Sequence, residues 1–294
     1  MNSSPRVGFG PRWQRGLRIA AASFVASAVA SCSIFDDFNP FGAERYKTII
    51  EPEAPASKTY DQGLLKLAND DPQSAAKKFT DLGKQFPDSD WARKGLLMTA
   101  YAQFQSADYE DAIQSAQRYV QLYANSPDAA YALYLEANSY YNQIPDVSRD
   151  QERAAKALEA FQTVVAKFPK SEYVEDSKFK IQVCEDQLAG KEMSIGRFYL
   201  NRRNYLAAIN RFRNVLTNYQ STRHSEEALY RLVEAYLGLG IPDEAQTAGA
   251  ILGHNFPDGQ WYKDAYALLK GGGLEPHENE SSWISKLFHT IVPS

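Results

Sequence analysis

The side chains that usually carry catalysis are few in this sequence, and they are not grouped. Its four histidines are scattered, and none belongs to an H-E-x-x-H sequence, which would place two zinc ligands on one helical face. They are His224, His254, His277 and His289. The glycines at 271–273 lack the Lys and the Ser or Thr of a phosphate-binding loop, and the nucleophile pattern G-x-S-x-G is missing. We therefore expect no catalytic residue, no metal ligand and no cofactor, and a protein that is not an enzyme.

The remaining reactive side chains are two cysteines, and their surroundings predict different roles. Cys32 ends a segment with a basic start and a short apolar run at 19–30, which has the flanks of a signal peptide. This run is too short to span a bilayer comfortably. The sequence Val29-Ala30-Ser31-Cys32 resembles a bacterial lipobox, in which the cysteine becomes the N-terminus and carries lipid. An ordinary cleaved signal with a chance cysteine is the alternative.

A lipid on Cys32 would anchor the mature chain, because each methylene group buried in a membrane contributes about 0.8 kcal/mol. In lipoproteins of this kind, an Asp directly after the lipidated cysteine usually retains the protein in the inner membrane. This chain has Ser33 there, so the resemblance implies the outer membrane. We expect a lipoprotein signal peptide at 1–31 and a lipidated tether at 32–57, in which Pro, Gly and Asp residues break any regular pattern.

One phrase recurs along the rest of the chain. Ala245, Gly249, Leu252 and Pro257 stand at offsets of 0, 4, 7 and 12, which places the first three on one helical face and ends the helix at the proline. The same offsets describe Ala75, Phe79, Leu82 and Pro87; Ala112, Ala116, Tyr119 and Ala124; Ala157, Phe161, Val164 and Pro169; and Ala208, Phe212, Val215 and Gln220. Each phrase follows another helical pattern, so the sequence predicts five helix pairs. Such a pair resembles the tetratricopeptide repeat, whose unit is about 34 residues.

We therefore expect an all-α solenoid of five tetratricopeptide-like pairs, about ten helices, over residues 58–270. Its N-terminal half is 58–168 and its C-terminal half is 169–270. A helix at 261–269 should cap the last apolar face, as solenoids require. Cys184 lies among apolar residues of the C-terminal half, and we expect it to be a buried structural thiol.

The three glycines that begin at Gly271 predict a flexible joint, followed by a tail at 271–294. Five apolar residues of this tail fall on one helical face: Trp283, Ile284, Leu287, Phe288 and Ile291. A short amphipathic segment of this kind can bind a groove or a membrane surface. A weakly ordered tail is the alternative, and the sequence leaves both open.

Without a reactive centre, the chemistry that remains is that of binding surfaces. A net charge of −4 on 294 residues gives no reason to expect nucleic acid as a partner. Stacked helix pairs expose an extended face, and four tyrosines of the first helices are candidates to contact extended peptides there: Tyr60, Tyr101, Tyr131 and Tyr134. The fourth pair concentrates arginines that are candidates to dock an acidic partner: Arg197, Arg202, Arg203, Arg211 and Arg213. A solvated helix face is the alternative for these arginines.

Several longer phrases resemble one protein family. They are Ile144-Pro145-Asp146-Val147-Ser148-Arg149-Asp150-Gln151; Phe168-Pro169-Lys170-Ser171-Glu172-Tyr173; residues 198–211, which begin Phe198-Tyr199-Leu200-Asn201; and Leu252-Gly253-His254-Asn255-Phe256-Pro257 with Trp261-Tyr262. In this order, and behind a lipobox, they resemble the BamD family of lipoproteins from the outer-membrane β-barrel assembly machine, in its α-proteobacterial form. The likeness extends over nearly the whole mature chain.

The resemblance implies a scaffold without enzymatic activity, which a lipid on Cys32 anchors to the periplasmic face of the outer membrane of a Gram-negative bacterium. In this family the C-terminal repeats are associated with the periplasmic POTRA region of BamA, and the N-terminal repeats with unfolded outer-membrane proteins. The resemblance also implies other lipoproteins of the assembly machine as partners.

Carried over to this chain, Tyr60, Tyr101, Tyr131 and Tyr134 lie in the substrate half, and the docking half contains Arg197, Arg202, Arg203, Asn210 and Arg211. Two rival interpretations stay open. One is another tetratricopeptide lipoprotein scaffold, of envelope polysaccharide export or cell division. The other is an enzyme whose site the motifs miss.

Overall fold

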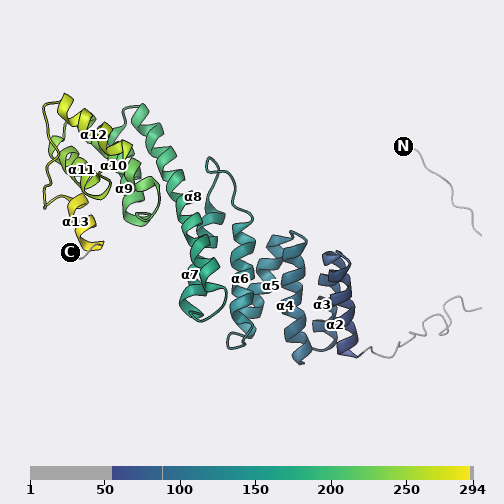
Figure 1. Ribbon diagram of the computed structural model, residues 1–294. Helices are drawn as coiled ribbons and strands as arrows, with labels where there is room; N and C mark the ends of the chain where they lie inside the picture. The colour runs from purple at the N-terminus through teal and green to yellow at the C-terminus, as the bar shows by residue number, and fades with distance from the viewer. Residues whose placement is uncertain (1–54, 88, 292–294) are drawn as a thin grey trace, which may run out of the picture. The chain divides into compact units, whose positions relative to one another are not determined.

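The computed structural model describes residues 55–87 and 89–291, and this part of the chain is all-helical (Figure 1). The expected signal peptide, Cys32 and nearly all of the expected tether lie outside the described residues. The helices are α2 (Ala56–Ala68), α3 (Pro72–Gln85), α4 (Asp90–Gln105), α5 (Tyr109–Leu122), α6 (Ala129–Tyr141), α7 (Glu152–Lys167), α8 (Val174–Asn201), α9 (Tyr205–Asn218), α10 (His224–Leu239), α11 (Pro242–Asn255), α12 (Gln260–Gly271) and α13 (Trp283–Ile291). None of these described helices combines the length and apolar character needed to cross a membrane.

The helices from α2 to α11 form five consecutive pairs, and each helix packs mainly on the helices before and after it in the chain. Helix α12 then packs on both α10 and α11, and so covers the end of the last pair. This arrangement confirms the predicted all-α solenoid of five tetratricopeptide-like pairs with a C-terminal capping helix. It is the expected result when each amphipathic pair can bury its apolar face only against its neighbours.

Local sequence explains where these helices begin and end. The side chains of Asp71, Ser89 and Asn204 accept hydrogen bonds from the backbone N–H groups three residues further on, which satisfies a free donor at each N-terminus. Helices α3, α7 and α11 are each followed directly by a Phe, which in turn directly precedes the proline of the recurring phrase. A residue before proline is disfavoured in the helical conformation, so the phrase stops each helix at the expected position.

The recurring phrase supplies the core, as its spacing predicts. Phe79, Phe161 and Phe212 are fully buried, together with the small residues four positions before them. A β-carbon added at Gly196 would lie 2.4 Å from a ring carbon of Phe212, and one added at Gly63 would lie 2.5 Å from the ring of Phe79. The small residue of a first helix therefore makes room for the aromatic ring of the second helix, rather than for an aromatic of its own helix.

Helix α8 is the longest described helix, with 28 residues, and it packs on α7 of the N-terminal half and on α9 of the C-terminal half. It carries Cys184, which is fully buried beside Phe161 and Ala157 of α7. Burial raises the pKa of the Cys184 thiol to about 12, so this thiol stays protonated near neutral pH. A buried, unreactive thiol is the structural role that the sequence predicts.

The residues after Gly271 form a packed segment that ends in helix α13. Ile284 is fully buried and Phe288 nearly so, and both belong to the same core cluster as α9, α10 and α11. Two hydrogen bonds hold the connection between α12 and α13 against α11. The Gln246 side chain donates to the Glu275 carbonyl at 2.7 Å, and the His277 N–H donates to the Gln246 carbonyl at 3.3 Å. The apolar face of the amphipathic segment therefore packs on the last helix pair of its own chain.

Candidate functional site

Two surfaces on the described helices contain the residues that the sequence singled out. In the described part of the chain, no group of three or more His, Cys, Asp or Glu side chains is placed to hold a metal ion. We describe the two surfaces in turn, first the tyrosines of the N-terminal half and then the fourth helix pair.

The structure brings three of the four predicted tyrosines into one row. The ring centroids of Tyr101 and Tyr131 are 6.5 Å apart, and Tyr131 is followed by Tyr173 at 5.4 Å. Tyr134 stacks on Tyr173 at 4.8 Å. Tyr60 lies outside this row and packs on Trp91 and Phe79, each at 5.4 Å. We call Tyr101, Tyr131, Tyr134 and Tyr173 the tyrosine row.

Tyr173 is not among the predicted tyrosines because the sequence places it at the start of the fourth pair, in the C-terminal half of the solenoid, whereas the four predicted tyrosines lie in the N-terminal half. In the structure Tyr173 directly precedes the first turn of α8. The signal that could have identified it was its position four residues after Pro169, in the connection between α7 and α8. At that position the chain turns back toward α6, so a side chain there meets the preceding pair. This is why a residue 39 positions after Tyr134 stacks on it.

The tyrosine row is electrically neutral but is held by charged neighbours. Burial raises the pKa of Tyr131, and burial together with a hydrogen bond to Glu172 raises the pKa of Tyr173 to about 12. The Tyr134 hydroxyl donates to Asp176 at 2.5 Å, and Lys180 pairs with Asp176 at 2.8 Å while lying 5.1 Å from the Tyr134 ring centroid. These contacts fix half-buried rings that offer apolar faces and hydroxyl groups together.

The structure separates the predicted docking residues of the fourth pair into three places. Arg197 extends from α8 to α10, where it makes two contacts of 2.9 and 3.0 Å with the Glu227 carboxylate. Arg202 and Arg203 lie exposed in the turn between α8 and α9. Asn210 and Arg211 lie on α9 and line a shallow pocket with α8. The five residues therefore do not form a single patch.

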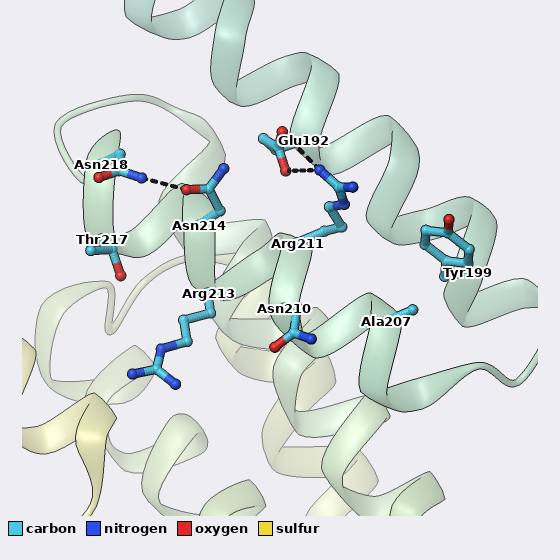
Figure 2. Close-up of a pocket in the computed structure, with 9 residues that line it drawn as sticks. All are labelled: Glu192, Tyr199, Ala207, Asn210, Arg211, Arg213, Asn214, Thr217 and Asn218. Carbon is cyan, nitrogen blue, oxygen red and sulfur yellow. Dashed lines mark hydrogen bonds and ion pairs between the residues drawn. The ribbon is translucent and has the colours of Figure 1, made fainter.

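The pocket between α8 and α9 has a volume of about 480 Å³ (Figure 2). Figure 2 shows Arg211 reaching toward Glu192, whose two carboxylate oxygens it contacts at 3.2 and 3.3 Å. Arg213 also lines the pocket but extends away from that ion pair. Because Glu192 is the only acidic residue among the lining side chains, it balances one arginine and leaves the pocket with a positive charge.

The turn between α8 and α9 combines arginines with exposed apolar side chains, which sequence reasoning also missed. Phe198 is 50% exposed and Leu206 is 63% exposed. The guanidinium of Arg202 lies 4.2 Å from the Phe198 ring centroid. Aromatic and arginine side chains are the types enriched at the centres of protein interfaces. We call Phe198, Arg202, Arg203 and Leu206 the fourth-pair turn.

Comparison with known proteins identifies the family. Residues 52–252 match the YfiO family model, which is described as outer membrane lipoprotein. The outer membrane protein assembly factor BamD of Caulobacter vibrioides is 44% identical over 256 residues, which cover 87% of this chain and 81% of that protein. BamD of Rickettsia prowazekii is 45% identical over 229 residues, which cover 78% and 91%. BamD of Neisseria meningitidis serogroup A is 33% identical over 219 residues, which cover 71% and 82%.

The match to the family model includes helices α2 to α10 and most of α11, and therefore both the tyrosine row and the fourth-pair turn. These comparisons confirm the resemblance that the repeat phrases carry. The chain belongs to the BamD family of outer membrane lipoproteins.

Proposed function

We propose that this protein is an outer membrane protein assembly factor, and that it acts as a scaffold without catalytic activity of its own. The observation that carries this proposal is the identity of 44% to a protein named outer membrane protein assembly factor BamD, over 87% of this chain. The all-helical array supports it, because stacked pairs present extended binding surfaces. Within this proposal, each of the two surfaces of the described residues binds a different partner.

The tyrosine row is the surface that receives unfolded outer-membrane proteins. A strand of a β-barrel alternates apolar and polar side chains, and half-buried tyrosines offer both a flat apolar face and a hydroxyl group. Such contacts are individually weak, and they impose little sequence preference. Weak binding suits a client that must leave again, and the folding of the barrel itself would supply the free energy for that departure.

The fourth-pair turn and the adjacent pocket are the docking surface for the POTRA region of BamA, with other assembly-machine lipoproteins as further partners. Exposed Phe198 and Leu206 supply apolar area, while Arg202 and Arg203 supply exposed positive charge that no described carboxylate pairs with. An acidic partner surface is complementary to this combination. The protein as a whole is held on the periplasmic face of the outer membrane by lipid on Cys32.

A pull-down tests this assignment. The tagged, lipidated protein would be purified from its own envelope in mild detergent, and its partners identified by mass spectrometry. We expect a large β-barrel protein with periplasmic repeats, recovered near one-to-one. Recovery of polysaccharide-export or cell-division proteins in its place would reject the assembly role and support the alternative envelope scaffold.

The lipid anchor gives a prediction of its own. Changing Cys32 to alanine removes the thiol that would carry the acyl chains, so we expect Cys32→Ala to be unlipidated and to leave the membrane fraction. Intact-mass spectrometry and membrane fractionation measure both properties. The matched control is Cys184→Ala, which removes the other cysteine and should keep the lipid. Acylation of the Cys32→Ala protein would contradict the assignment.

A further inference from the structure

The pocket between α8 and α9 contains an arginine whose position is set by the C-terminal helix. The Arg213 guanidinium lies 4.6 Å from the ring centroid of Trp283 in α13. Trp283 is itself fixed, because its indole N–H donates to the Tyr236 hydroxyl at 2.8 Å and its neighbour Ile284 is fully buried. A guanidinium that stacks on an aromatic ring keeps its N–H donors at its edge. Arg213 is therefore held with those donors available.

Other arginines of the C-terminal half form ion pairs with carboxylates, whereas Arg213 does not form one with any described residue. Arg197 pairs with Glu227, and Arg211 pairs with Glu192. Among the residues that the structure describes, no carboxylate lies within ion-pair distance of Arg213, whose side chain is exposed. The positive charge of the pocket is thus concentrated on one side chain that the fold has already oriented.

Beside Arg213, three asparagines follow one another along α9 at intervals of four residues: Asn210, Asn214 and Asn218. The Asn218 side-chain amide donates to the Asn214 carbonyl oxygen, which leaves the Asn214 NH₂ group to donate outward. Four residues of helix rise about 6 Å. Two residues of a β-strand rise about 6.6 Å, so successive asparagines match every second residue of an extended chain. An asparagine amide can donate to and accept from a peptide group.

From this geometry we propose that the pocket binds an extended polypeptide segment that carries one carboxylate, with Arg213 as the carboxylate anchor and the asparagines on its backbone. The inference rests on the proposed docking role of the fourth pair, and it adds the chemistry of the segment that is bound. It also assigns a purpose to the C-terminal helix: Trp283 orders Arg213, so less rotamer entropy is lost when the carboxylate pairs with it.

The test measures binding of a defined probe to the full chain in mild detergent. The probe is a C-terminally amidated peptide of sequence Thr-Val-Thr-Asp-Thr-Val that carries an uncharged fluorescent label, and its binding is measured by fluorescence anisotropy. We expect Arg213→Ala to weaken binding about tenfold, because a charge-assisted, bidentate pair is lost. Arg213→Lys keeps the positive charge but loses the planar, forked N–H donors of the guanidinium, and we expect it to weaken binding about threefold. The exposed Arg149 is the control, and Arg149→Ala should bind like the unchanged protein.

A second probe, with Asn in place of its Asp, completes a double-mutant cycle. Against the unchanged protein this probe should bind as weakly as the Asp probe binds to Arg213→Ala. Trp283→Phe keeps an apolar ring but loses the bond to Tyr236, and it should give a smaller loss with α13 in place. Equal affinity for the Asp and Asn probes, or an Arg213→Ala protein that binds normally, would overturn the proposal.

The pull-down separates this inference from the proposed function. If the unchanged protein recovers the β-barrel partner while its affinity for the probe does not depend on Arg213, the carboxylate site is wrong and the assembly role stands. If the probe discriminates as expected while no β-barrel partner is recovered, the site stands and the assembly role is wrong.

Discussion

Replacing Phe212 with alanine is expected to lower the free energy of unfolding by about 3–5 kcal/mol. The Phe212 ring is fully buried in the core cluster shared by α8 to α13, and it fills the space left by Gly196. Gly196, which faces the ring, has no side chain that could move into the cavity and refill it. Urea unfolding followed by circular dichroism measures the change.

The exposed Leu206 provides the matched control for Phe212 on the same helix. Leu206 is 63% exposed, so Leu206→Ala removes apolar atoms without opening a cavity and should change stability by no more than about 0.5 kcal/mol. A loss of less than about 1 kcal/mol for Phe212→Ala would show that the contact between α8 and α9 does not have the geometry described above.

Reversing the charge of the fourth-pair turn is expected to have the second large effect. The double change of Arg202→Glu and Arg203→Glu should lower recovery of the β-barrel partner at least about tenfold in the pull-down, because it places like charges against an acidic partner surface. Helicity should be unchanged. Both side chains are exposed, and neither makes an ion pair with another described residue.

The control for this charge reversal is a second double change of equal charge, Arg118→Glu with Arg149→Glu. Both of these arginines are exposed, and both lie in the N-terminal half. Their reversal should leave the recovery of the partner as it is. If the Arg202 and Arg203 protein recovers its partner normally, then the docking surface lies elsewhere on the chain.

Much of the fold can be predicted from the sequence because its signals are local. The 0, 4, 7 spacing of Ala208, Phe212 and Val215 defines a buried helical face, and all three are fully buried. Prolines that follow Phe86, Phe168 and Phe256 stop three helices at the expected positions. These properties depend on residues within a few turns of one another, so no knowledge of the tertiary structure is needed.

The binding surfaces could be predicted only in part. Tyr101, Tyr131 and Tyr134 were identified by their first-helix positions, but Tyr173 joins them only because the start of α8 packs on α6. The ion pairs of the arginines could not be predicted from the sequence either. The sequence places Arg197, Arg211 and Arg213 in one basic segment, but the carboxylate that pairs with Arg197 lies 30 residues away and the one that pairs with Arg211 lies 19 residues away.

The sequence by itself therefore determined the helix pairs, their boundaries, their buried faces and the family phrases, because each depends on spacing along one or two neighbouring helices. Only the tertiary structure decided which charges remain available and what the C-terminal segment does. Trp283 stands 70 positions after Arg213, and the stacking of the two side chains arises from the packing of α13 against the last helix pair. Ion pairing and stacking depend on distance in space, and spacing along the chain does not encode it.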